Sequence, residues 1–263
     1  MKGMGGATTY PVHPSKPKKR RLVVGDIHGA HRALLQVFDK SGFRYDKDQL
    51  VCIGDVADGW SEVPECFDEL LAVKDLIYIL GNHDEWLYNW FVFEQELPIW
   101  VVQGGRQSID AYNKYKGNRD LHEMLLKHAL PYYVMEEVEE GIGWKKLFVH
   151  GGYDWHRSID ETSVMDLTWD RHLWETALFW KQVEPACYKC KVQDYDEVFI
   201  GHTSTVNKTY GNSLKPVHAS NVWNIDQGAG WEGKLTLMDI DTKEYWQSDL
   251  VTELYPEEKG RRG

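Results

Sequence analysis

Five short apolar runs, each followed by a glycine- or histidine-containing polar cluster, constrain the fold of this chain more than any other feature. They are Arg21–Val24, Leu50–Ile53, Leu76–Leu80, Leu147–Val149 and Val198–Ile200. Apolar runs of this length, bounded by turn residues, predict buried strands of a mainly parallel sheet. Because binding sites in open α/β sheets lie beyond the carboxyl ends of the strands, we expect the polar side chains after these runs to converge.

The side chains expected to converge carry donor atoms of the kind that bind divalent cations. They are Asp26, His28, Asp55, Asn82, His150 and His202. Three imidazoles, two carboxylates and one amide are enough ligands for two ions. Two ions about 3.5–4 Å apart need a shared ligand, and Asp55 is our candidate because a carboxylate has two oxygens. Oxygen and imidazole ligands suit Mn²⁺, which we favour, as well as Fe or Zn²⁺.

The motifs around these residues resemble the calcineurin-like metallophosphoesterase superfamily, in particular its bacterial and phage serine/threonine phosphoprotein-phosphatase branch. In chain order they read Gly-Asp-x-His-Gly, Gly-Asp-x-x-Asp, Gly-Asn-His-Asp, His-Gly-Gly and Gly-His-Thr. One such motif alone is a weak signal, whereas five in order are specific. The resemblance covers roughly Arg21 to Trp246 and implies an α/β fold, a four-layer α/β/β/α sandwich with helical insertions.

The resemblance also implies a role for each ligand and adds an acid. Asp26 and His28 would hold the first ion, and the second ion would be held by Asn82, His150 and His202. A water that bridges two cations loses a proton near neutral pH, and the resulting hydroxide attacks phosphorus in line. His83 would then protonate the leaving group as general acid, with Asp58 orienting its imidazole.

Two arginines that hold the phosphate in the phosphatase branch are missing from their usual positions. That branch usually reads Gly-Asp-x-x-Asp-Arg-Gly, whereas this chain has Gly59 and Trp60 after Asp58, and Leu80 stands where arginine often precedes Gly-Asn-His. Such arginines bind phosphate bidentately. The loss leaves room for an aromatic-bearing substrate, and Trp60 is either a flat surface for it or a packing residue.

Other basic residues are candidates for contacting the phosphate. Arg171 ends a Leu-Thr-Trp-Asp-Arg segment that resembles the Leu-x-Trp-x-Arg element of the family, whose arginine faces the phosphate. Arg106 follows a Gln-Gly-Gly turn and is a weaker second candidate. In the same region a group of large apolar residues is either core of an added helical layer, which we favour, or a platform for an aromatic substrate group. The group is Trp86, Leu87, Trp90, Phe91 and Phe93.

Three functions fit these observations. The first is a phosphomonoesterase of the protein-phosphatase type, acting on a phosphorylated partner such as a phosphoprotein, a nucleotide or a small phosphoester. The second is a nucleotide-directed hydrolase of dinucleoside polyphosphates, cyclic nucleotides or phosphodiesters. The third is a non-catalytic, metal-stabilised binding module. An intact His83–Asp58 pair counts against the third function, because a binding scaffold has no need of an acid.

Charge and hydropathy exclude some classes of binding partner and indicate the cellular compartment. The chain has 41 acidic against 30 basic residues, a net charge of −11, which argues against extended nucleic-acid binding. No apolar stretch reaches the ~18 residues that a membrane-spanning helix needs, and the first residues lack the apolar segment of a signal peptide. We therefore expect a cytoplasmic protein with no membrane partner.

We expect one metallophosphoesterase domain over residues 21–263, with insertions at about 85–145 and 153–195, preceded by a flexible basic arm at 1–20. Cys187 and Cys190 have the spacing of half a zinc site, but we expect reduced thiols. The last third contains alternating segments that predict antiparallel strands of a second sheet. They are Asn221–Asp226, Lys234–Ile240 and Glu244–Trp246.

Overall fold

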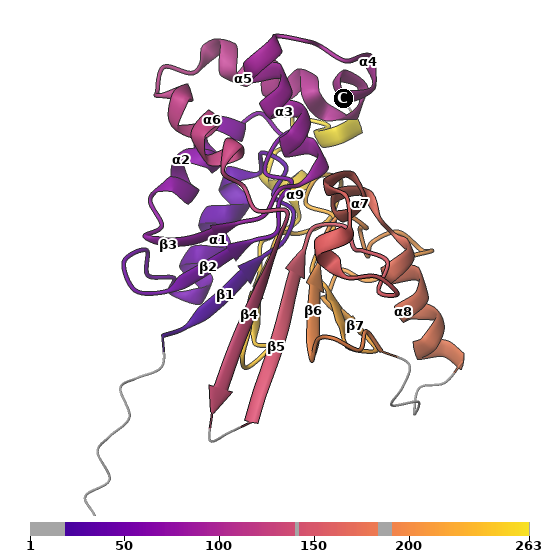
Figure 1. The fold of residues 1–263 in the computed structure, drawn as a ribbon. Coiled ribbons are helices and arrows are strands. Elements are labelled where there is room, and N and C mark those ends of the chain that lie inside the picture. The colour runs from indigo at the N-terminus through magenta and orange to yellow at the C-terminus, as the bar shows by residue number, and fades with distance from the viewer. Residues whose placement is uncertain (1–18, 140–141, 184–190, 263) are drawn as a thin grey trace, which may run out of the picture.

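Two five-stranded sheets face each other in the computed structural model, which describes residues 19–139, 142–183 and 191–262 (Figure 1). The strands are β1 (Arg21–Val24), β2 (Gln49–Cys52), β3 (Asp75–Tyr78), β4 (Tyr132–Glu139), β5 (Ile142–Val149), β6 (Glu197–Ile200), β7 (Val217–Ala219), β8 (Val222–Asn224), β9 (Thr236–Asp239) and β10 (Tyr245–Gln247). The predicted arm at 1–20, except its last two residues, and the Cys187/Cys190 pair lie outside the described residues.

Helices cover the outer faces and one end of the sheets (Figure 1). The α-helices are α1 (His31–Ser41), α2 (Val63–Leu71), α3 (Asn82–Phe93), α4 (Pro98–Trp100), α5 (Arg106–Lys114), α6 (Arg119–Lys127), α7 (Val164–Trp169), α8 (His172–Val183) and α9 (Val251–Leu254). Shorter helical turns are η1 (Val101–Gly105), η2 (Ile159–Glu161) and η3 (Gly260–Arg262).

The five predicted strands form, but they divide between the two sheets. The first sheet has the order β10-β9-β1-β2-β3, with β1, β2 and β3 parallel. The second has the order β4-β5-β6-β8-β7, with β5, β6 and β8 parallel. The prediction of one mainly parallel sheet was therefore wrong. An apolar run indicates that both faces of a strand are buried, but it does not indicate which sheet the strand joins.

The strands of the last third also divide between the sheets. β7 and β8 belong to the second sheet, as predicted, whereas β9 pairs antiparallel with β1 and carries β10 with it at the edge of the first sheet. The assignment of all these strands to the second sheet was wrong for β9 and β10. Both sheets therefore contain parallel strands at their centre and antiparallel strands at an edge.

Alternation along the strands produces the predicted four layers. In β1, Leu22 and Val24 pack in the same cluster as residues of α1 and α2, while Val23 packs between the sheets. Between the sheets, Phe148 of β5 and Phe199 of β6 stack with ring centroids 4.9 Å apart. The outer face of the second sheet packs against α7 and α8. Three apolar layers thus separate four layers of secondary structure.

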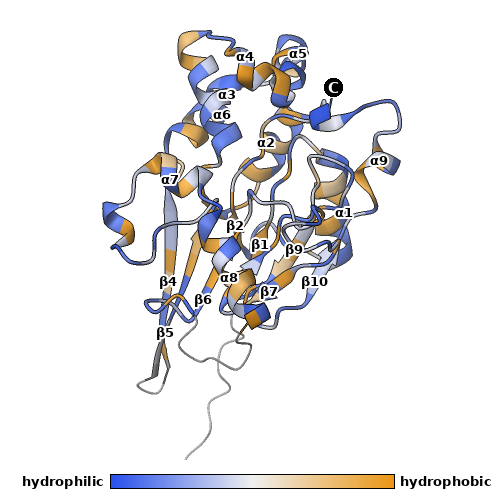
Figure 2. Cartoon of the chain, turned by 90° about the vertical axis from the view of Figure 1, so that its right-hand side faces the viewer, coloured by the Kyte–Doolittle hydropathy of each residue, from blue (hydrophilic) through white to orange (hydrophobic). Residues whose placement is uncertain are grey.

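α1 and α2 bury apolar residues that recur at helical spacing. α1 buries Ala33, Leu34, Val37 and Phe38 and ends at Gly42, whose φ of 60° suits glycine. Apolar and polar residues alternate along such helices in Figure 2. The helices α3 to α6 of the first insertion lie over one end of the sheets (Figure 1). Leu87, Trp90 and Phe91 are buried there, which confirms them as core, and Trp86 packs partly buried against the same cluster. Phe93 is exposed, so the prediction was wrong for this residue.

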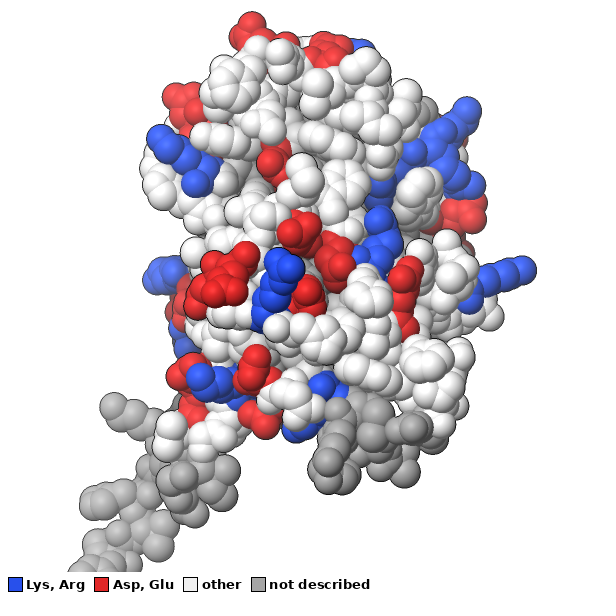
Figure 3. Space-filling view, turned by 45° about the vertical axis from the view of Figure 1, so that its right-hand side comes forward, with Lys and Arg blue, Asp and Glu red and all other residues white. Residues whose placement is uncertain are grey.

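Uncharged residues take up much of the face drawn in Figure 3, where acidic and basic side chains are interspersed. Within the described part of the chain, every helix is too short or too polar to cross a membrane.

Candidate active site

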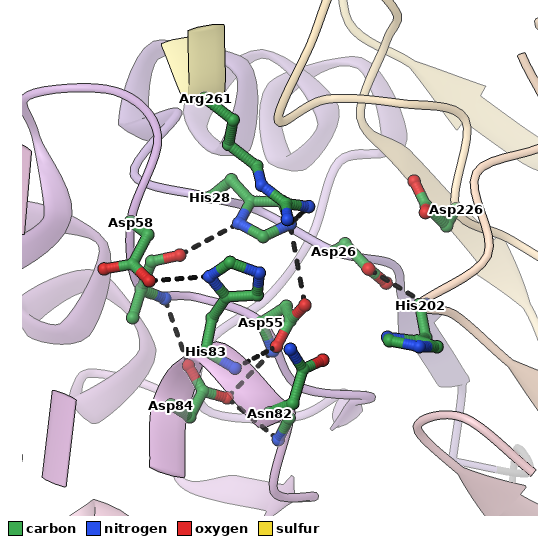
Figure 4. A network of polar contacts seen from close by, with 12 residues as sticks. Asp26, His28, Asp55, Asp58, Asn82, His83, Asp84, His202, Asp226 and Arg261 are labelled. Carbon is green, nitrogen blue, oxygen red and sulfur yellow. Dashed lines mark hydrogen bonds and ion pairs between the residues drawn. The ribbon is translucent and has the colours of Figure 1, made fainter. Parts of the chain in front are cut away.

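Donor atoms from both sheets meet in two groups that share one carboxylate (Figure 4). Within each group the donor atoms lie within 4.8 Å of one another. The first group is Asp26, His28 and Asp55, and the second is Asp55, His150 and His202. Asp55 is thus common to both groups, as a ligand shared by two cations must be.

Tight turns directly after the strands aim these side chains. His28, Asp55, Asp58 and His202 have φ values of 51°, 52°, 72° and 61°, in the left-handed region that non-glycine residues seldom adopt. Each such residue costs about 1–3 kcal/mol and persists only where the surroundings enforce it. Backbone strain of this kind concentrates at functional sites, and here it lies on the residues whose side chains converge.

Asp84 enforces the turn after β2. Its carboxylate accepts hydrogen bonds from the backbone N–H groups of Asp55 (2.8 Å), Val56 (2.9 Å) and Ala57 (3.0 Å), and from Gly81 (3.1 Å). Although Asp84 follows His83 in sequence, it points away from the donor groups and acts on the loop that carries Asp55.

The histidines present their free nitrogens to the carboxylates. The Nδ1 of His28 lies 2.9 Å from the carbonyl of Ala57, so it carries the proton, and its Nε2 lies 3.6 Å from Asp55 Oδ2. His150 is held in the same way by the carbonyl of Ile53 at 2.7 Å, and its Nε2 lies 3.3 Å from Asp55 Oδ2. A backbone acceptor on Nδ1 fixes the tautomer in which Nε2 can bind a metal.

Unpaired buried atoms show that this donor set fits divalent cations. Among the described residues, Asp26 Oδ1 and His202 Nε2 are buried without a hydrogen-bond partner. Buried polar atoms are almost always paired, so orphaned donors inside a ligand cluster indicate a bound ion. The predicted amide ligand is also in place, because Asn82 Oδ1 lies 3.2 Å from His150 Nε2.

The electrostatics of the carboxylates follow from burial and mutual repulsion. Burial, reinforced by the nearby carboxylate of Asp226, raises the pKa of Asp26 well above its usual range. Burial also opposes the charge on Asp55, but His150 and His83 hold the pKa of Asp55 well below its usual range. Cations placed between these carboxylates would relieve the repulsion.

His83 and Asp58 form a buried pair beside the two groups. The imidazole Nδ1 lies 2.6 Å from Asp58 Oδ2. The indole N–H of Trp100 donates to both carboxylate oxygens, at 2.9 and 2.8 Å, and the hydroxyl of Ser108 donates to Oδ1 at 2.6 Å. Because Trp100 and Ser108 donate to the carboxyl group, a proton on Asp58 has only His83 Nδ1 as its hydrogen-bond acceptor.

Burial favours the uncharged form of this pair. It raises the pKa of Asp58 to about 8, and together with the positive charge of Arg261 it lowers the pKa of His83 to about 3. The net-neutral pair holds two protons, one between Nδ1 and Oδ2 and one on Nε2. Because Nε2 faces away from Asp58, this form can donate a proton to a neighbouring oxygen.

Comparison with known proteins agrees with this geometry. The profile of the calcineurin-like phosphoesterase family matches residues 19–211, which include all six donors and the His83–Asp58 pair. The chain belongs to the calcineurin-like phosphoesterase family. Like other calcineurin-like phosphoesterases it is a hydrolase of phosphate esters.

Similar calcineurin-like proteins include protein phosphatases and a nucleotide hydrolase. The chain is 30% identical to serine/threonine-protein phosphatase 2 of Salmonella typhimurium over 57% of its own length and 66% of that protein. It is 25% identical to the symmetrical bis(5'-nucleosyl)-tetraphosphatase of Pseudomonas entomophila, over 89% of this chain and 95% of that one. A serine/threonine phosphatase structure from Saccharomyces cerevisiae superposes with a TM-score of 0.53 at 15% identity, covering 95% and 85%. The predicted branch is confirmed.

Two of the three predicted substrate-binding residues, Trp60 and Arg106, lie away from the donor groups. Trp60 is fully buried, donates to the Ala229 carbonyl at 2.7 Å and stacks on Tyr255, so it is a packing residue with no face for a substrate. Arg106 pairs with Glu96 at 2.9 Å on the surface and does not line the pocket beside the donor groups. Its position at the start of α5 points its side chain outward.

Arg171 does lie at the site. It lines a pocket of about 470 Å³ that reaches the ligand His202. Tyr210 and Trp231 line the same pocket, together with Arg261 from η3. The structure thus places Arg171 in the pocket beside His202, and its contact with a phosphate stays a prediction.

Sequence reasoning missed several residues of the site. Asp226 could have been found, because it follows the apolar run of β8 in the same way that the ligands follow theirs. Trp100 and Ser108 come from the helical insertion, where spacing gives no signal for a contact with Asp58. Arg261 lies beyond Trp246, where the resemblance ends, and only the fold brings it to the site.

Proposed function

We propose that this phosphoesterase is a two-metal phosphomonoesterase of the protein-phosphatase type, with His83 as its general acid. One observation carries the proposal: the buried His83–Asp58 pair, 2.6 Å apart, lies beside two donor groups that share Asp55. A pair that holds a proton at Nε2 serves the departure of a leaving group and has no use in a binding scaffold.

Each donor has a role in this proposal. Asp26 and His28 hold one ion, Asp55 is shared, and the other ion is held by Asn82, His150 and His202. Two divalent cations at these positions would activate water for in-line attack and neutralise charge on the phosphoryl oxygens. We propose Mn²⁺ as the metal, because oxygen and imidazole ligands suit it. His83 then passes its Nε2 proton to the departing oxygen, and Asp58 keeps the imidazole in position.

A second candidate is hydrolysis of nucleotide polyphosphates. Tyr210 and Trp231 line the pocket beside His202, and aromatic rings there offer a surface on which a base could stack. The similarity to a bis(5'-nucleosyl)-tetraphosphatase favours the same candidate.

A substrate panel separates the two candidates. With Mn²⁺ present, turnover is compared for p-nitrophenyl phosphate, bis-p-nitrophenyl phosphate, a phosphopeptide and diadenosine tetraphosphate. We expect the highest kcat/KM on the monoesters. A preference for diadenosine tetraphosphate would replace the first candidate by the second, and a preference for the bis-ester would point to a phosphodiesterase.

The variant Asp55→Asn tests the shared ligand. Loss of the charged bridging carboxylate is expected to abolish turnover and to lower the Mn²⁺ content measured by elemental analysis. Asp249→Asn is the matched control, because Asp249 lies on the surface beside Lys40 and outside the site. Full activity and full metal content in Asp55→Asn would remove Asp55 from its proposed role.

A further inference from the structure

We propose that Arg261, delivered by η3, supplies the phosphate-binding cation that positions 59 and 80 lack, and that it acts together with Arg171. The inference rests on the proposed phosphoesterase function and adds to it the residues that grip the phosphoryl group of the substrate. Positions 59 and 80 are Gly59 and Leu80, where related phosphatases carry arginine.

The Arg261 side chain reaches the donor groups from η3, as Figure 4 shows. Its Nη1 lies 3.4 Å from His28 Nε2, and so lies beside the first donor group. Its other polar contacts are to a neutral residue: Nε donates to the Gln103 carbonyl at 3.3 Å and Nη2 to Gln103 Oε1 at 3.2 Å. The ring of Trp231 lies 4.7 Å from the guanidinium carbon and orients its plane.

Gly59 makes room for this side chain. A Cβ at Gly59 would lie 3.3 Å from Arg261 Cγ and 3.0 Å from the His28 carbonyl, and the φ of 87° is itself one that L-residues rarely adopt. A Cβ at Gly230 would lie 2.9 Å from Arg261 Cδ and 2.4 Å from a ring carbon of His28. An arginine at position 59 would therefore compete with Arg261 for the same space.

Arg261 forms no salt bridge with any described residue, so its guanidinium is available to bind an anionic ligand. In the described part of the chain neither Arg261 nor Arg171 forms an ion pair, whereas the adjacent Arg262 pairs with Glu232 on the surface. A guanidinium that is buried, lies over an aromatic ring and forms no salt bridge with a carboxylate still has N–H groups available for an anion.

The two arginines flank one pocket. Arg171 and Arg261 both line the pocket of about 470 Å³ that also reaches the ligand His202. A phosphoryl group bound at the donor groups from this pocket would meet both guanidinium groups. The chemistry recognised is a phosphate dianion, and guanidinium forks match its oxygens bidentately.

A purely structural Arg261 would behave differently. Such a residue would only hold its neighbours in place through its contacts with Gln103 and His28, and its removal would displace the His28 donor and lower the metal content. A substrate-binding Arg261 lies beside the cations and repels them, so its removal would leave metal affinity unchanged or slightly higher. Metal content therefore separates the two roles.

The test compares Arg261→Ala and Arg261→Lys with the control Arg262→Ala. Three quantities are measured: Mn²⁺ content, the affinity of the Mn²⁺-loaded protein for orthophosphate by calorimetry, and KM and kcat on p-nitrophenyl phosphate. For Arg261→Ala we expect KM and the phosphate Kd to rise roughly 10- to 100-fold, kcat to change far less, and Mn²⁺ content to stay unchanged. Lysine should restore part of the affinity, because it keeps the charge without the fork.

Two results would overturn the inference: an unchanged phosphate Kd and KM in Arg261→Ala, or a loss of Mn²⁺ in that variant. If the alanine variant does not fold, Arg261→Gln retains the length of the side chain and is judged by the same measurements. If the unaltered protein hydrolyses none of the panel substrates, the proposed function fails, whereas the calorimetric comparison with orthophosphate still decides the role of Arg261.

Discussion

At the scale of single residues, Asp58 determines what His83 can do. Trp100 and Ser108 donate to its carboxyl group, His83 Nδ1 lies 2.6 Å from Oδ2, and none of its oxygens is left to solvent. The imidazole is thereby fixed with Nδ1 toward Asp58, so Nε2 is the atom from which a proton can leave. This arrangement makes the contribution of His83 depend on how much the leaving group needs a proton.

His83→Ala should therefore show a strong dependence on the leaving group. We expect a loss of roughly 10²–10⁴ in kcat on alkyl phosphates, whose alkoxides are poor leaving groups, and a smaller loss on p-nitrophenyl phosphate. Metal content should be unchanged, because His83 is not one of the proposed ligands. The measurement is kcat over a series of leaving groups of increasing pKa.

His31→Ala is the matched control, since His31 also lies beside a carboxylate, Glu69 at 3.4 Å, but outside the site. It should leave the whole series unchanged. Equal losses on alkyl and p-nitrophenyl substrates in His83→Ala would remove His83 as the acid.

Sequence was informative for residues that follow a strand and uninformative for those that do not. The donors from Asp26 to His202 could be predicted because each follows the carboxyl end of an apolar run, and parallel strands bring those ends together. Arg261 and Trp100 lie in short helical turns whose local sequence carries no periodic signal. Their place at the site depends on packing between segments far apart in the chain.

At the scale of secondary structure, Asp48 connects the first strand, the end of the first helix and the second strand. Its buried carboxylate accepts hydrogen bonds from Arg44 and Arg20, each at 2.6 Å, just before β2 begins. Burial disfavours the charge, but these arginines still hold the pKa of Asp48 below its usual value. The carboxylate form of Asp48 is therefore more stable, relative to the protonated form, in the folded state than in the unfolded chain.

Asp48→Asn should destabilise the fold in a pH-dependent way. A depressed folded-state pKa contributes stability above the unfolded pKa of about 3.9, and that contribution is lost as the pH falls through the folded value. At pH 7 we expect a loss of about 2–3 kcal/mol in the free energy of unfolding, which shrinks below about pH 4. Denaturant unfolding at several pH values measures it.

The exposed pair of Asp154 with Arg157 provides the control, because surface ion pairs contribute little. Asp154→Asn should have little effect at any pH. A loss in Asp48→Asn that stays constant from pH 7 to pH 3 would contradict the assignment.

The elements themselves were largely predictable, but their assignment to sheets was not. The helical spacing of the apolar residues in α1 and its end at Gly42 are local signals that are visible in the sequence. β9 pairs with β1 because that edge of the first sheet is available to it. The availability of a sheet edge depends on the completed fold and is not visible in the local sequence. Strand patterns specify burial, while pairing partners follow from topology.

At the scale of the whole molecule, the site joins the two sheets. Asp26 and Asp55 follow strands of the first sheet, whereas His150 and His202 follow strands of the second. Cations bound by both pairs would connect the two halves of the sandwich, so unfolding would have to release them. Ligands that bind only the folded state stabilise it by mass action.

Mn²⁺ should therefore raise the melting temperature. At a concentration 100 times its Kd the stabilisation is about 2.7 kcal/mol, which corresponds to a rise of roughly 5–10 °C for a chain of this size. Differential scanning calorimetry with and without a chelator measures the shift. Asp55→Asn should largely lose it and Asp249→Asn should keep it; an equal shift in both variants would place the bound metal elsewhere.

The contact between His28 and Arg261 spans 233 residues of sequence, and this separation matters during translation. A nascent chain synthesised through β10 already contains every strand of both sheets and all the proposed metal ligands. It still lacks Tyr255, on which Trp60 stacks, and Arg261. Since synthesis proceeds from the N-terminus, Arg261 is the last residue of the proposed site to be made, and the phosphate-binding part of the site is completed only after every proposed metal ligand has been synthesised.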